Sequence, residues 1–69
     1  MQYNDAEKKK ILDQGMITRS LIENEVALKK CRLYGEMASD KAVKSFFRDQ
    51  AHGLEDVQQY MRKTMSDLG

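Results

Sequence analysis

The sequence predicts an all-α protein: an antiparallel hairpin of two helices that pairs with a second copy into a four-helix bundle. Three observations indicate this fold class. The 69 residues contain no proline and only four scattered glycines. Residues with high helix propensity, such as alanine, leucine, lysine and glutamate, are abundant. Apolar residues recur at helical spacing on both sides of one short break.

The break is the segment EMASDKA, residues 36–42. Just before it, Gly35 can begin to unwind the first helix. Ser39 or Asp40 can start the second helix, because either side chain can accept a hydrogen bond from a backbone N–H of its first turn. Such a short connection makes the two helices antiparallel neighbours.

The predicted helices cover about residues 13–37 and about residues 40–66. Asn4 or Asp5 could start an additional or continuous helical segment before them. We therefore separate an N-terminal segment, residues 1–12, from the hairpin domain, residues 13–69.

One side of the second predicted helix is apolar and should pack against the first helix. It carries Val43, Phe47, Leu54, Val57, Met61, Met65 and Leu68, with Phe46 and Tyr60 on its edge.

The first predicted helix has two apolar stripes. One carries Ile17, Leu21, Leu28, Cys31 and Ala38, flanked by Met16, Ala27 and Tyr34. The other, roughly opposite, carries Ile22, Val26, Leu33 and Met37, with Ile11 and Leu12 nearby. A helix that is apolar on two sides needs partners on both, and the second helix covers only one. The second stripe therefore predicts an interface with another chain; the alternative is a scatter of exposed apolar side chains.

Length and charge narrow the function classes. A chain this short buries only roughly 60% of its unfolded surface, so helix packing and self-association must stabilise it. Its single cysteine, Cys31, excludes an internal disulfide and is interpreted as a small buried apolar residue.

A net charge of +1 gives no field to attract nucleic acid or a membrane surface. The apolar part of KKKILDQGMI, broken by Asp13, is too short for a signal peptide, so we expect an intracellular protein.

The segment RDQAHGLED, residues 48–56, holds the only histidine together with three acidic residues. Asp49 and Asp56 lie three and four residues from His52, so the three side chains can meet on one helix face. The helical periodicity places His52 roughly opposite the predicted core, where it would be solvated and without orienting partners. We expect an exposed face here. The candidate metal ligands, should there be a site, are Glu25, Asp49 and His52.

Residues 11–61 resemble the spore coat protein F-like family of the ferritin-like superfamily. The resemblance consists of LDQ at the start of the first helix, the ASD joint, the apolar pair before RDQAH, and DVQQYM near the end. It implies a ferritin-like four-helix bundle, here built from two hairpins. Diiron members bind metal through a glutamate and an inward Glu-x-x-His pair. The corresponding inward pair in this chain is Leu54 and Val57, which disfavours oxidase or iron-storage activity.

The expected function is that of a non-enzymatic structural or interaction protein, similar to spore coat protein F, that acts through homodimeric helix-bundle assembly. No cofactor is expected. The expected partners are a second copy, as homodimer or higher oligomer, and other spore-coat-type proteins, in the cytoplasm or, as the resemblance implies, in the spore. The alternatives are a ferritin-like metal-binding module and a helical adaptor that receives another protein's helix.

Overall fold

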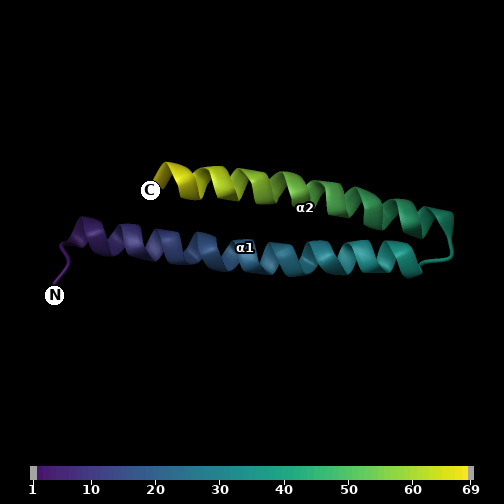
Figure 1. Ribbon diagram of the computed structural model, residues 1–69, viewed down its shortest axis with the longest axis horizontal. Helices are drawn as coiled ribbons and strands as arrows, with labels where there is room; N and C mark the ends of the chain where they lie inside the picture. The colour runs from purple at the N-terminus through teal and green to yellow at the C-terminus, as the bar shows by residue number, and fades with distance from the viewer. Residues whose placement is uncertain (1, 69) are drawn as a thin grey trace.

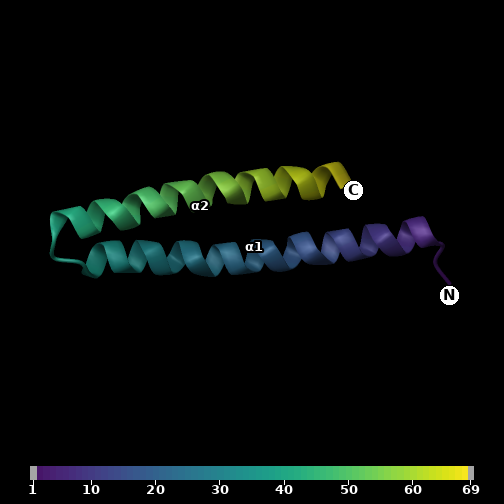
Figure 2. The ribbon, with the colours of Figure 1, turned by 180° about the vertical axis from the view of Figure 1, so that it is seen from behind.

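The computed structural model describes residues 2–68, which form two helices, α1 (Asp5–Met37) and α2 (Lys41–Leu68). The helices lie side by side and run in opposite directions, as both views of the ribbon show (Figure 1, Figure 2). The molecule is a rod with extents of 56 × 18 × 11 Å. The predicted all-α antiparallel hairpin is therefore confirmed, and residues 2–68 contain no strand. The outer limits of the predicted domains, residues 1 and 69, lie outside the described residues.

Helix α1 begins at Asp5 instead of Asp13, so residues 5–12 continue the same helix. Asn4 caps it: its side chain accepts a hydrogen bond from the Glu7 N–H at 2.7 Å, and the Glu7 carboxylate accepts one from the Asn4 N–H at 3.3 Å. This reciprocal pair satisfies two backbone N–H groups that have no partner within the helix. Asp5 and Glu7 also place negative charge at the positive end of the helix dipole. Figure 1 shows the first turns of α1 extending beyond the end of α2.

The connection between the helices is short and ordinary in its backbone. The Ala38 N–H donates to the Tyr34 carbonyl at 2.9 Å as α1 ends. The Asp40 carboxylate accepts from the Val43 N–H at 3.0 Å, so Asp40, one of the two predicted capping residues, caps α2. Gly35 does not unwind the helix: it lies inside α1, where a Cβ would stand 3.5 Å from the Phe47 Cβ.

The residues that face the other helix recur at alternating intervals of three and four, the heptad spacing of a coiled coil. We call these residues the seam. On α1 the seam consists of Gln14, Ile17, Leu21, Asn24, Leu28, Cys31 and Gly35, followed by Ala38 just after the helix, and on α2 of Lys44, Phe47, Ala51, Leu54, Gln58, Met61, Met65 and Leu68, all of them buried or half-buried.

The first stripe predicted for α1 coincides with its seam, but the predicted core side of α2 is partly wrong. Val43 and Val57 are not on the seam and remain 43% and 45% exposed. Ala51, which was not predicted, is buried instead. The physical reason is that the apolar arc of α2 is wider than the strip that one neighbouring helix covers.

The core of the hairpin is thin. Leu28, Ala51 and Asn24 have exposed fractions of 6%, 5% and 8%, and no other described residue is buried to this degree. Asn24 is the only polar side chain among them, and its Nδ2 donates to the Leu54 carbonyl at 2.9 Å. A buried polar residue on the seam fixes the alignment of the two helices, here by holding Asn24 level with Leu54.

Candidate interaction surfaces

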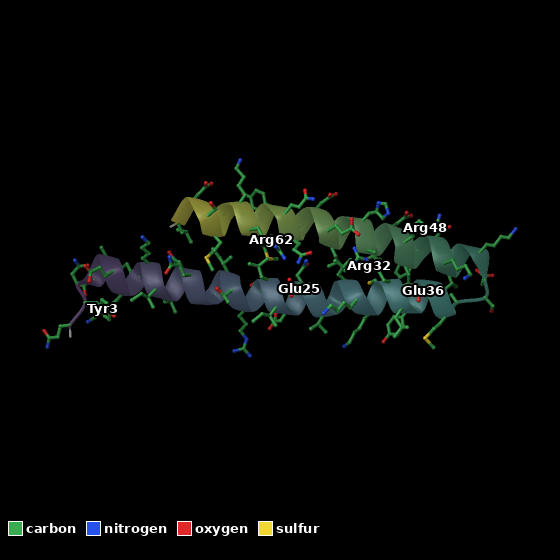
Figure 3. The ribbon with its side chains drawn as sticks, in the orientation of Figure 1. Tyr3, Glu25, Arg32, Glu36, Arg48 and Arg62 are labelled. Atoms are coloured by element: carbon green, nitrogen blue, oxygen red, sulfur yellow. The ribbon has the colours of Figure 1, made fainter. Side chains whose placement is uncertain are left out.

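Charged side chains from both helices meet along one side of the seam, which we call the charged edge. Glu25 accepts hydrogen bonds from Arg62 and from Gln58, each at 3.1 Å. About two helical turns further along, Arg32 pairs with Glu55 at 2.7 Å. Figure 3 shows Glu25, Arg32 and Arg62 in the space between the two helices. An acidic and a basic residue alternate along each helix at this edge, and each of the two carboxylates pairs with an arginine of the other helix.

The charged edge adds little to stability. The paired side chains are between 41% and 62% exposed, and ion pairs at such positions contribute about 0–1 kcal/mol each. Opposite charges at matching heights nevertheless favour the observed alignment of the helices over a shifted one. The edge therefore supports the register of the hairpin, and its surface is polar.

The three candidate metal ligands do not form a common site. Glu25 is bound by Gln58 and Arg62 on the charged edge. Asp49 and His52 are exposed on α2, and His52 borders a shallow groove between the helices that Cys31 and Arg48 also line. Within residues 2–68, no three histidine, cysteine, aspartate or glutamate side chains lie close enough together to hold a metal ion. The inward pair implied by the family pattern, Leu54 and Val57, is apolar, and Val57 is exposed.

We expect His52 to be dispensable for the fold and the purified protein to contain no stoichiometric iron or zinc. Because His52 is exposed and forms no ion pair within the described residues, His52→Ala should change the free energy of unfolding by less than about 0.5 kcal/mol. Urea titration and elemental analysis of the same preparation would test both statements. Bound metal that is lost on His52→Ala, together with thermal stability, would contradict them.

The second predicted stripe of α1 lies on its outer side, away from α2, and we call it the back stripe. Ile22, Val26, Leu33 and Met37 are all exposed, as are Ile11 and Leu12 nearby. The structure thus brings these residues into one row on a single helix. Within the hairpin they pack against nothing, so the stripe is open to a partner.

A second apolar surface, the apolar edge, lies on the side of the seam opposite the charged edge and draws on both helices. Its exposed side chains are Met16 and Tyr34 from α1 and Val43, Phe46, Val57 and Tyr60 from α2. Near the turn, the seam residue Phe47 packs edge-on against Tyr34 and Phe46 of this edge, with ring centroids 5.4 Å and 5.1 Å apart. Towards the other end it forms a groove with no charged lining residue, made by Met16, Ile17, Ser20, Tyr60, Met61 and Thr64.

The apolar edge was missed in the sequence because Val43 and Val57 were placed in the hairpin core. The heptad spacing carries a signal that separates the two groups. Phe47, Leu54 and Met61 follow one another at intervals of seven, whereas Val43 and Val57 fall on the position next to that row. A heptad register assigned to α2 alone would have placed them beside the seam.

Comparison with known proteins gives no relative: no family model, no curated protein and no solved structure matches the chain. Neither described helix is long and apolar enough to cross a membrane.

Proposed function

We propose that this chain is a structural or interaction protein that works by self-association and carries out no chemistry of its own. One observation carries the proposal. Thirteen large apolar side chains among residues 2–68 are at least 43% exposed, while only two apolar residues, Leu28 and Ala51, are buried. An apolar surface this extensive marks a site of protein association in a soluble chain.

The accessible surface supports the same proposal. The hairpin exposes 5704 Å². A compact folded protein of 8.0 kDa exposes only ~4,500 Å². Merging two such rods into one compact body would remove ~4,000 Å² in total, which lies in the range of obligate homodimers. Self-association would therefore supply the core that the single hairpin lacks.

The resemblance of residues 11–61 to spore coat protein F-like proteins supports a structural role within a ferritin-like bundle. Two hairpins side by side supply the four helices that such a bundle needs. Other coat-type helical proteins would then be the natural heterologous partners. The geometry of the charged edge favours this role over metal binding, because its carboxylates are engaged by arginines.

Sedimentation equilibrium tests the proposal. We expect a homodimer at micromolar concentration, with a melting temperature that rises with protein concentration because folding and association are linked. A compact monomer with a concentration-independent melting temperature would contradict it.

A second candidate function is that of an adaptor that receives another protein's helix. The back stripe favours it, because Ile22, Val26, Leu33 and Met37 form a row one helix wide that is exposed on α1 alone. Such a row suits a single amphipathic helix laid along it. The double substitution Val26→Glu and Leu33→Lys would abolish binding of such a helix while leaving the seam intact.

A further inference from the structure

The two edges of the hairpin differ in a way that selects the surface for a four-helix bundle. In a bundle of two hairpins, each hairpin presents both of its helices to the other. The back stripe belongs to α1 alone and faces away from α2, so it cannot be the centre of such an interface. The charged edge is polar and internally paired. The apolar edge alone combines exposed apolar side chains from both helices.

We propose that a second copy of this chain packs against the apolar edge, around a two-fold axis near Ala27 and Gly53. This inference rests on the self-association proposed above and names its face, which shares only Met37 with the predicted interface of Ile22, Val26, Leu33 and Met37. The partner is a copy of the same chain because the edge is complementary to itself.

The complementarity begins with a row on α1 that borders the apolar edge and shares Met37 with the back stripe: Met16, Glu23, Lys30 and Met37, at intervals of seven residues. A two-fold axis pairs a surface with itself. If it crosses α1 midway along this row, Glu23 faces Lys30 of the second copy, and Met16 faces its Met37. Opposite charges and like apolar groups then meet, with two Glu–Lys pairs for each dimer.

The outer row on α2 has the same property. Phe46 and Tyr60 lie seven residues before and after Gly53. A two-fold axis at Gly53 therefore places Phe46 of one copy opposite Tyr60 of the second copy. Gly53 leaves open space between them, since a Cβ built there has no neighbour within 4 Å. A flat gap between two rings permits the close approach of a second helix.

Both rows require the same axis. The hydrogen bond from Asn24 to the Leu54 carbonyl sets the two residues at one height in the antiparallel hairpin. The midpoint of the α1 row, beside Ala27, therefore lies within about one helical turn of Gly53. One axis can therefore satisfy both rows at once. Such self-complementarity is expected of a surface that binds a second copy and is not required of a surface that binds an unrelated protein.

Cysteine cross-linking of the full chain tests the location of the axis. In a Cys31→Ser background, Gly53→Cys should form an intermolecular disulfide rapidly under mild oxidation, because the two copies of this residue meet at the axis. Gly15→Cys is the matched control: it is also a helical glycine with open space around its Cβ, but it lies on the outer side of α1. It should cross-link only slowly, at the rate of random collision.

A charge exchange tests the pairing itself. Glu23→Lys should raise the dimer dissociation constant about tenfold, because each of two attractive pairs becomes repulsive. Adding Lys30→Glu should restore it. Glu23 also pairs with Arg19 on its own helix at 3.5 Å, and the exchange does not restore that contact, so recovery reports the intermolecular pair.

The outcomes separate this inference from the proposal of self-association. A dimer in which Gly53→Cys cross-links rapidly and the charge exchange restores affinity supports both. A dimer in which Gly15→Cys cross-links as fast as Gly53→Cys, or in which the exchange restores nothing, overturns the proposed face and leaves self-association standing. A monomeric wild-type chain overturns both.

Discussion

Replacing Leu28 by alanine should leave most of the protein molecules unfolded at 25 °C. Leu28 is the most buried large apolar side chain of the described residues, with an exposed fraction of 6%. Leucine-to-alanine changes at such positions cost about 2–5 kcal/mol through lost burial and the cavity left behind. A single hydrophobic core in a chain of this size supplies no more than about 3–5 kcal/mol, so the substitution removes most or all of the stability of the hairpin. Equilibrium unfolding in urea at a fixed protein concentration measures the cost.

Leu12 provides the matched control for this experiment. It lies on the same helix but is 62% exposed and off the seam. Leu12→Ala makes the same chemical change with almost no loss of burial, so it should shift the free energy of unfolding by no more than about 0.5 kcal/mol. Equal costs for the two substitutions would mean that the seam is misplaced or that the N-terminal turns of α1 are covered by a partner.

The hairpin could be predicted from the sequence because its determinants are local. The absence of proline, the helix-forming composition and the capping residue Asp40 act within a few residues of one another. The N-terminal start was harder to place, since Asn4, Asp5 and Asp13 are all suitable capping residues. The structure shows that Asn4 is the cap, because it exchanges reciprocal hydrogen bonds with Glu7. The glutamate three residues after Asn4 is the sequence feature that distinguishes it from the other two candidates.

The candidate surfaces were less predictable because they depend on how far each helix is rotated about its axis. Two apolar stripes on α1 were visible in its spacing, and both exist. On α2 a single broad arc carried Val43, Phe47 and Val57, and the sequence alone did not show where the contact with α1 ends. Small and polar seam residues such as Ala51 and Asn24 carry no large apolar side chain, so the apolar periodicity of the sequence does not mark them as core.

Ala51 gives the second large effect that we expect. It is the most buried described residue, at 5% exposed, and its small side chain lies on the seam of α2. Ala51→Asp would place a short charged group between the helices, where it is too short to reach water and has no partner to pair with. Either its charge is neutralised or the helices separate, and we expect a loss of helicity large enough to unfold the chain at neutral pH.

The matched control is Ala42→Asp, the same change on the same helix. Ala42 is exposed in the first turn of α2, where a carboxylate interacts favourably with the helix dipole, so this variant should be as stable as the wild type or slightly more stable. Circular dichroism during thermal unfolding compares the two. The lower helix propensity of aspartate inside a helix and its favourable interaction with the dipole in the first turn together account for a difference of only about 1–2 kcal/mol, so a larger difference reports the burial of Ala51. If Ala51→Asp melts like Ala42→Asp, the helices do not pack along the seam described. The assignment of the apolar edge, which is defined by its position beside the seam, would then also be wrong.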